Sequence, residues 1–300
     1  MSPTRATARV STVLETAAVW RVRGMELRLG PVPILMGVVN VTPDSFSDGG
    51  RYASAERAIA RGLALVEAGA AILDVGGEST RPGAEPVPPE EELRRILPVV
   101  RGLAERTRVP LSIDTTKLEV ARAALESGAR IVNDVSALRF APGIADLAAE
   151  SGAGLVLMHM RGEPRTMQAD PRYGDLLGEI GSELLTAAGA AERAGVERSA
   201  IVLDPGIGFG KTAADSYRLI ARLEELAANG YPVLVGHSRK SFLDPGRRRD
   251  PAERVPESIA GGLLAALGGA AILRVHDVEP HARALSVYDR WLEAMRGSEG

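Results

Sequence analysis

The chain has 300 residues, of which 45% are hydrophobic and 25% charged, and this composition excludes wholesale disorder and collagen-like structure. It contains no cysteine, which excludes disulfides, thiolate metal sites and cysteine nucleophiles. With 36 basic and 39 acidic residues the net charge is −3, so no global positive field attracts nucleic acid or an anionic membrane.

The start of the chain shows no targeting or membrane signal. Residues 1–18 lack a continuous apolar core with a small-residue cleavage site, and no later stretch is apolar over the length of a membrane span. We expect a cytoplasmic protein in which residues 1–18 form a flexible extension and residues 19–300 form one domain. Residues 20–29 alternate apolar and polar side chains around Gly24, which predicts a short hairpin.

Eight short apolar runs follow the hairpin. Each is rich in Ile, Leu and Val and lacks polar alternation, as is typical of parallel strands buried on both faces. The runs are 34–39, 71–75, 109–113, 129–132, 154–158, 200–203, 232–235 and 270–275. Segments with helical spacing separate them, such as the one containing Ile59, Leu63 and Val66. Glycines at helix ends precede several runs, at Gly69, Gly128 and Gly269.

Eight strands that alternate with eight helices predict an α/β fold, a single closed (β/α)₈ TIM barrel; a doubly wound open sheet is the alternative. Polar residues stand at the end of every run, where a barrel carries its active site. They are Asn40, Asp74, Asp114, Asn133, Asp134, His159, Asp204, the GHSRKSF segment, Arg274 and His276. Helix N-capping explains one or two Asp or Asn residues, but His159, Lys240 and Arg274 are poor N-caps, so we expect one convergent site.

The residue types at these strand ends suggest two ligand chemistries. Asp114, Asn133 and Asp204 offer carboxylate and amide groups that suit a flat heterocycle with adjacent N–H donors, such as an amino-pyrimidinone edge. Arg274 and His276 lie two apart on one strand and suit a phosphate or pyrophosphate near the last strands.

Several other features bear on the same face. Asn40 offers an oxygen ligand for a Mg²⁺ ion that keeps waters and bridges phosphate oxygens. The polar segments 40–50 and 76–83 are long enough to act as lids. The segment DPGIGFGKT is not a P-loop, because Pro205 stands where the first glycine is required. Lys240 lies in an Arg-Lys pair beside the expected anion site, which favours binding over Schiff-base chemistry.

The motifs as a set resemble those of one enzyme family. NVTPDSFSDGG, DVGGESTRPG, SIDTTK, NDVSAL, LMHMRGEPRTMQ, LDPGIGFGK, SRKSF and RVHDV follow one another from residue 40 to near the last helix. In sequence and order they resemble the motifs of the dihydropteroate synthases over essentially the whole barrel. The resemblance implies a folate-pathway transferase that condenses the pyrophosphate ester of 6-hydroxymethyl-7,8-dihydropterin with p-aminobenzoate, giving 7,8-dihydropteroate and pyrophosphate. It also implies a homodimer.

The resemblance further implies a role for each matching residue. Asn40 would be the Mg²⁺ ligand, and Asp48 would face the reacting carbon. The pterin would be held by Asp114, Asn133, Asp204 and Lys240, and the pyrophosphate by Arg274 and His276 with Asn40. The p-aminobenzoate pocket would be lined by Thr80, Arg81, Pro82, Phe209 and Ser241.

The expected chemistry agrees with the residue types found from composition and position. Loss of pyrophosphate would leave a methylene cation conjugated to the dihydropterin, an SN1-like route in which Asp48 and Asp204 stabilise the cation and Arg274 and His276 stabilise the departing anion. Two alternatives remain: a non-catalytic pterin-binding paralogue with a regulatory role, and a pterin-binding methyltransferase domain that docks a corrinoid partner. Neither would need the STRPG segment together with Arg274 and His276.

Overall fold

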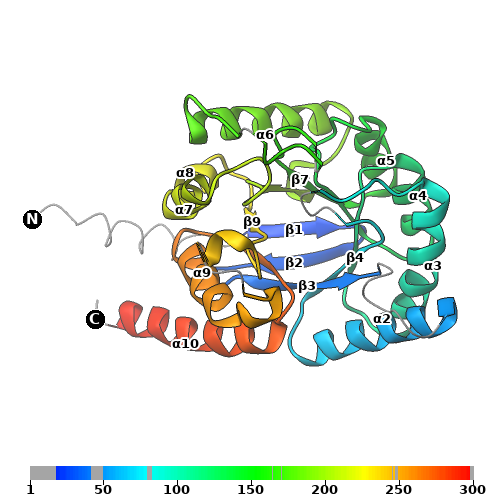
Figure 1. Ribbon diagram of the computed structural model, residues 1–300, viewed down its shortest axis with the longest axis horizontal. Helices are drawn as coiled ribbons and strands as arrows, with labels where there is room; N and C mark the ends of the chain where they lie inside the picture. Colours follow the sequence, from blue (N-terminus) through cyan, green and yellow to red (C-terminus); the bar gives the residue numbers. More distant parts are fainter. Residues whose placement is uncertain are drawn as a thin grey trace, which may run out of the picture.

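The computed structural model describes residues 18–41, 50–79, 83–163, 165–169, 171–244, 246 and 249–297. An N-terminal hairpin, formed by β1 (Ala18–Val22) and β2 (Met25–Leu29), is followed by alternating strands and helices, with the helices outside a central sheet (Figure 1). The central strands are β3 (Ile34–Asn40), β4 (Ile72–Gly76), β5 (Leu111–Asp114), β6 (Ile131–Asp134), β7 (Gly154–Met158), β8 (Ile201–Asp204), β9 (Leu234–Val235) and β10 (Ile272–Val275).

The eight central strands are all parallel and form a barrel. Their order is β8-β7-β6-β5-β4-β3-β10-β9, so each strand pairs with its neighbour in the chain except where β10 returns to pair with β3. The two ends of this order meet at a parallel bridge between Leu203 and Val233, where the Leu203 amide donates to the Pro232 carbonyl over 3.0 Å. This closure excludes the open sheet and confirms the predicted barrel.

Helices surround the barrel, and α2 to α6 follow one another around the right side and top of Figure 1. The helices are α2 (Gly50–Glu67), α3 (Pro89–Arg106), α4 (Leu118–Glu126), α5 (Gly143–Ser151), α6 (Leu176–Arg193), α7 (Ala213–Ala221), α8 (Leu223–Ala227), α9 (Val255–Leu267) and α10 (Val278–Gly297). The glycines expected at helix ends have positive φ, +103° at Gly69, +114° at Gly128 and +91° at Gly269, a conformation that favours glycine.

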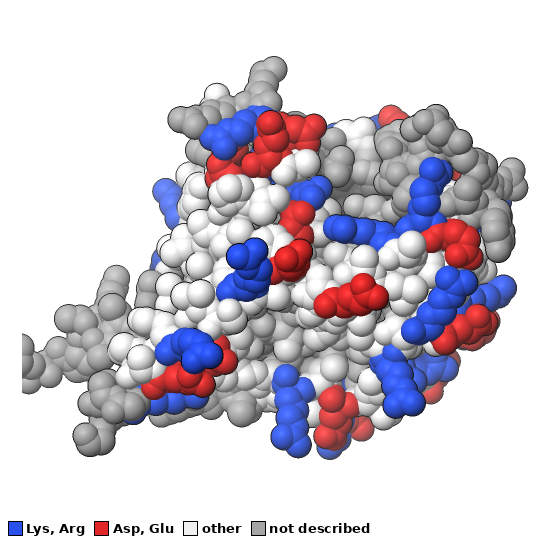
Figure 2. Space-filling view, turned by 90° about the horizontal axis from the view of Figure 1, so that it is seen from below, with Lys and Arg blue, Asp and Glu red and all other residues white. Residues whose placement is uncertain are grey.

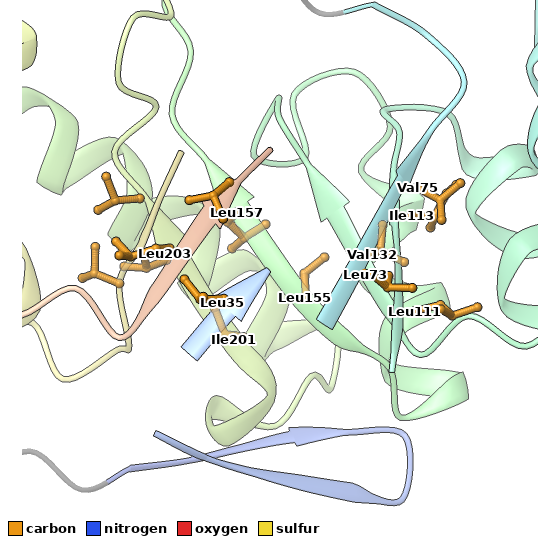
Figure 3. Close-up of a cluster of buried hydrophobic side chains, with 14 of the residues drawn as sticks. Leu35, Leu73, Val75, Leu111, Ile113, Val132, Leu155, Leu157, Ile201 and Leu203 are labelled. Atoms are coloured by element: carbon orange, nitrogen blue, oxygen red, sulfur yellow. The ribbon is translucent and has the colours of Figure 1, made fainter. Parts of the chain in front are cut away.

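Alternate strand residues divide into an outer and an inner set. Leucine, isoleucine and valine side chains that point outward pack beneath the helices in the main core, as Figure 3 shows for Leu73 and Leu155. The inward set starts with a second apolar cluster near the amino ends of the strands. Its strand members are Met36, Ile72, Ile131, Val156, Val202, Leu234 and Ile272.

The hairpin closes the amino end of the barrel and lies beneath the strands in Figure 3. Trp20 is fully buried in the inner cluster, and its indole Nε1 donates to the Ala200 carbonyl over 2.8 Å. The Arg23 amide donates to Gly152 over 2.6 Å. Gly154 makes room for the hairpin, since a Cβ at this position would lie 2.5 Å from the Val22 side chain. The predicted hairpin is therefore confirmed, and it acts as a plug.

The surface carries both signs of charge. On the face shown in Figure 2, basic and acidic side chains are interspersed. Within the described residues, no helix combines the length and apolarity needed to span a membrane. Apart from Ala18 in β1, the predicted extension of residues 1–18 lies outside the described residues.

Candidate active site

The inward-facing positions become polar toward the carboxyl ends of the strands. Two residues beyond the apolar layer, the same inward direction is taken by Asp74 after Ile72, by Asn133 after Ile131 and by Arg274 after Ile272. The inner surface therefore changes from apolar to charged over one strand period. The structure gathers these side chains inside the barrel rather than on separate surfaces.

Arg274 lies at the centre of this group. Its Nε donates to Asp74 Oδ2 over 2.6 Å, and one terminal nitrogen donates to Asp114 Oδ2 over 2.7 Å. Asn133 Nδ2 also donates to Asp74 Oδ2, over 3.1 Å. Residues that are up to 200 positions apart in the sequence are thus tied into one network.

Burial governs the electrostatics of this network. It raises the pKa of Asp114 to about 7, although the Arg274 charge opposes the shift. Burial also lowers the pKa of Arg274, but Asp74 and Asp114 together outweigh it and raise this pKa above its usual value. The second oxygens of the two carboxylates, Oδ1 of Asp74 and Oδ1 of Asp114, are buried without a hydrogen-bond partner in the described structure. Such oxygens suit a ligand that brings N–H donors.

The loop after β8 brings a second part of the site together. Asp204 ends the strand, and its Oδ1 accepts from the Gly206 amide over 2.7 Å. Gly206 has φ +65°, and a Cβ there would lie 1.9 Å from the His159 carbonyl oxygen, so only glycine fits. A Cβ on Gly236 would lie 3.8 Å from Asp204 Oδ2 and 3.9 Å from the Arg274 side chain. Asp204 and Arg274 therefore flank the same point of the barrel.

Lys240 and Phe209 lie next to each other above this point. The Lys240 Nζ is 4.5 Å from the centre of the Phe209 ring and donates to the Ile207 carbonyl. Burial lowers the pKa of Lys240 to about 8, while the Asp204 carboxylate opposes this change. Burial likewise raises the pKa of Asp204, with Lys240 as the main opposing charge. Lys240 and Asp204 thus place one cation and one carboxylate near the face of the Phe209 ring.

The loops after β9 and β10 are fastened to each other. The Ser238 hydroxyl accepts from the His276 amide over 3.2 Å and lies 3.2 Å from His276 Nδ1. Arg239 forms a two-pronged ion pair with Asp277, with distances of 2.8 and 2.6 Å. His276 is thereby fixed relative to Lys240 and to the exposed Ser241, which begins the next short helical turn.

Some predicted site residues fall outside the described part of the chain. They are Asp48, Thr80, Arg81 and Pro82. The base of the second predicted lid is described: Lys117 pairs with Glu78 and also with Glu92 of α3.

Two polar strand ends do not join the site, which limits the expected convergence. Asp134 accepts from the Ser136 amide over 2.8 Å and from the Leu138 amide over 2.6 Å, so it caps its own loop. His159 contacts Lys211, whose Nζ lies 2.9 Å from its Nδ1. Each follows an inward residue by one position, Asn133 or Met158, and strand alternation therefore directs it outward.

Asp74 was expected among the polar strand ends of the site, but the sequence assigned it no role in binding a ligand. It is fully buried and contacts both Arg274 and Asn133. The available signal was its place in an apolar strand, two residues after the inward Ile72. A buried carboxylate at such a position requires a partner of opposite charge.

Asn40 fits the expected magnesium ligand only in a limited sense. It ends β3 on the inward side and is partly buried, and its amide oxygen is a hard donor. Within the described residues there is no group of three or more His, Cys, Asp or Glu side chains able to hold a metal. A single amide oxygen of this kind fits a Mg²⁺ ion that takes further ligands from waters and substrate phosphates.

Comparison with known proteins agrees with this geometry. The family model described as "Pterin binding enzyme" matches residues 36–276. The chain is 49% identical over 276 residues to the dihydropteroate synthase of Mycobacterium leprae, covering 89% of this chain and 96% of that relative.

Solved structures agree as well. One neighbour is the Xanthomonas albilineans dihydropteroate synthase with 4-aminobenzoic acid, with a TM-score of 0.85, 48% identity and coverage of 92% of this chain and 98% of that one. Another structure of the enzyme from that organism, in complex with 7,8-dihydropteroate, has a TM-score of 0.80, 45% identity and coverage of 90% and 98%.

Proposed function

The chain belongs to the dihydropteroate synthase family of pterin-binding enzymes, and on this basis we propose how its barrel rim carries out the family reaction. The enzyme joins the (7,8-dihydropterin-6-yl)methyl group of its diphosphate ester to 4-aminobenzoate and releases diphosphate. The observation that carries the assignment of roles is the network that joins Arg274 to Asp74 and Asp114 beside Asn133.

In this proposal the pterin binds deep in the barrel. Its N–H groups donate to the unpartnered oxygen of Asp114 and to Asp204, while Asn133 and Lys240 donate to its acceptor atoms. The buried and unpartnered Oδ1 of Asp114 supports this placement, because such an oxygen gains most from a ligand donor. The raised pKa of Asp114 falls back when those donors arrive, since hydrogen bonds to a carboxylate favour its ionised form.

Diphosphate lies above the pterin, near Arg274 and His276. The bond between the methylene carbon and the ester oxygen breaks, and the diphosphate leaves with the electron pair. Arg274 stabilises that developing negative charge, and Asp204, with Asp48 on the first lid, stabilises the methylene cation that remains. The permanent charge of Arg274, supported by its two carboxylates, suits this role.

The amine of 4-aminobenzoate then forms the new C–N bond and releases its proton. Thr80, Arg81, Pro82, Phe209 and Ser241 would line its pocket. The position of Phe209 against Lys240, at the outer edge of the pterin site, supports this for the described part of the pocket. Holding the amine in line with the methylene carbon supplies the advantage of proximity.

Magnesium is part of the proposal. Asn40 would hold the ion together with diphosphate oxygens, and the bound ion would neutralise charge on the leaving group. We also propose that the enzyme works in the cytoplasm, because a diphosphate ester crosses an apolar membrane only at great energetic cost.

We further propose that two chains form a homodimer through the outer faces of α9 and α10. Apolar side chains are exposed there, with Val287 at 70% and Leu264 at 51% exposure, together with Leu267 and Trp291. Light scattering coupled to size exclusion should give a dimer for the native chain. Combining Val287→Glu with Leu264→Glu should give a monomer, and Phe140→Glu, at an exposed phenylalanine in the β6–α5 connection, should leave the dimer intact.

A purified-protein assay tests the function directly. Diphosphate release should require the pterin diphosphate, 4-aminobenzoate and Mg²⁺ together. Binding of the pterin diphosphate without release of diphosphate under any of these conditions would instead support the non-catalytic paralogue.

A further inference from the structure

A cavity outside the barrel mouth is separate from the active site. It has a volume of about 530 Å³ and lies between α5 and α6, beside the carboxyl end of β7. None of the residues assigned above to the pterin, diphosphate or 4-aminobenzoate lines it. Its volume is within the range of roughly 300 to 1,000 Å³ that is usual for small-molecule sites.

The walls of the cavity are mainly apolar. Small and aliphatic side chains line it, with Pro142 and Ala145 on the α5 side and Leu184, Ala187 and Ala190 on α6. The lack of bulk on this side of α6 leaves room for a flat ring system, which would remove apolar surface from water.

One buried polar atom faces this apolar space. His159 lines the cavity and is 3% exposed, and its Nε2 has no hydrogen-bond partner in the described structure. The other ring nitrogen, Nδ1, lies 2.9 Å from Lys211 Nζ, and the same lysine nitrogen donates to the Phe209 carbonyl over 3.0 Å. The tautomer in which Nδ1 accepts from Lys211 carries its ring proton on Nε2, facing the cavity.

Glu183 completes the polar end of the cavity. Its Oε2 lies 3.2 Å from His159 Nε2 without making a hydrogen bond, and its side chain is half exposed. A carboxylate facing Nε2 agrees with a proton at that atom. Burial, assisted by Lys211, lowers the pKa of His159 to about 2, so the ring is a neutral donor at physiological pH.

At the His159 end the cavity thus presents an N–H donor and a carboxylate acceptor side by side; Arg139 and the hydroxyls of Ser136, Ser182 and Thr186 make up the rest of its polar lining. We propose that it is a second ligand site, which binds a neutral aromatic alcohol whose hydroxyl accepts from His159 and donates to Glu183. The Arg139 guanidinium already donates to the Ser136 and Gly162 carbonyls. At the His159 end an anionic ligand is disfavoured because Glu183 would repel it, and a purely apolar ligand would leave the His159 N–H unsatisfied.

Calorimetric titration of the full chain with 2-naphthol tests the proposal, with saturating 4-aminobenzoate present to occupy the active site. We expect 2-naphthol to bind roughly tenfold more tightly than 2-methoxynaphthalene, which lacks the donor, and more tightly than 2-naphthoate. Equal affinities for these three probes, absence of binding, or a 2-naphthol affinity that is lower with 4-aminobenzoate than without it would overturn the proposal.

Two variants locate the binding. Ala190→Phe should fill the cavity and abolish 2-naphthol binding, while Leu185→Phe, at an exposed position of the same helix outside the cavity, should not. Glu183→Ala should weaken 2-naphthol several-fold and remove its advantage over 2-methoxynaphthalene. Normal diphosphate release by the variants establishes that they fold, and retained binding in Ala190→Phe would contradict the site.

Discussion

The two ends of the barrel are closed in opposite ways by the same eight strands. At the amino end, a hairpin inserts Trp20 among apolar side chains. At the carboxyl end, Arg274 lies between two carboxylates, beneath loops rich in glycine. One end is built for stability and the other for binding.

The change between them takes only two residues of each strand. Ile72 and Ile272 face the plug, whereas Asp74 and Arg274, two positions later, face the site. The apolar layer shields the charged network from water on one side, which explains the perturbed pKa of Asp114. The apolar strand layer, which stays in place when the plug is altered, therefore contributes to the electrostatics of the site.

Truncating the plug should produce the largest effect of all, on stability alone. Trp20→Ala removes a fully buried side chain and its hydrogen bond to Ala200, so the free energy of unfolding should fall by about 3–5 kcal/mol. Urea denaturation measures this change, and kcat of the folded fraction should stay the same. Val19→Ala, at the neighbouring exposed position, is the control and should have little effect.

Removing the central cation should affect activity instead. Arg274→Ala eliminates a charge that stabilises the leaving diphosphate, and turnover should fall roughly 100-fold or more. Diphosphate release under saturating substrates measures it, with Arg222→Ala, an exposed arginine paired with Glu225, as the matched control. Unchanged turnover in Arg274→Ala would contradict the assigned role.

The stability of the protein should depend on pH through the carboxyl end of the barrel, where Asp114 lies, and not through the apolar amino end. The pKa of Asp114 is about 7 in the folded protein, above its unfolded value, so the folded state binds the extra proton. The free energy of unfolding should then decrease as pH rises from about 4 through 7, by at most about 1.4 kcal/mol per pH unit. Denaturation curves across this range should show the slope in the native chain and a weaker slope in Asp114→Asn. An equal slope in both would assign the titration to another group.

The smallest expected change concerns the turn of the plug. Gly24 has φ +77° and open space around it, so Gly24→Ala should cost only the left-handed strain, about 1 kcal/mol of stability. Gly30→Ala, where a Cβ also meets nothing but φ is not in the left-handed region, should be close to neutral. Similar losses in both variants, measured by thermal unfolding, would rule out strain as the cause.

The strands could be located from apolar runs, but four of their starts lie two residues later than predicted. The runs beginning at residues 109, 129, 232 and 270 suggested strands that in fact start at Leu111, Ile131, Leu234 and Ile272. A proline stands just before two of these strands. Pro110 and Pro232 have no N–H to donate, although their carbonyls accept from Leu73 and Leu203. Each proline thus accepts one hydrogen bond from the neighbouring strand but cannot donate one, so the regular strand begins after it. A hydrophobic run in the sequence does not reveal this.

The sequence predicted those residues of the site whose place depends only on their position at the end of a strand. Asp114, Asn133, Asp204 and Arg274 come together as expected, because the barrel brings all strand ends to one rim. His159 shows the limit: a polar type at a strand end does not fix its direction, which depends on the residue one position earlier. The partners of Arg274 were equally inaccessible, since they depend on distances across the barrel.

The hairpin also constrains how the molecule is made. Trp20 donates to the carbonyl of Ala200, 180 positions later and just before β8. The hairpin, although synthesised first, can therefore complete its contacts only when the chain has been made as far as β8. At translation rates of 5–20 residues per second, this wait is roughly 10–40 s, during which the indole has no partner. The amino end of the barrel therefore stays open for most of the synthesis of the chain. In this interval the apolar residues of the plug are exposed, and a chaperone would have most apolar surface to cover.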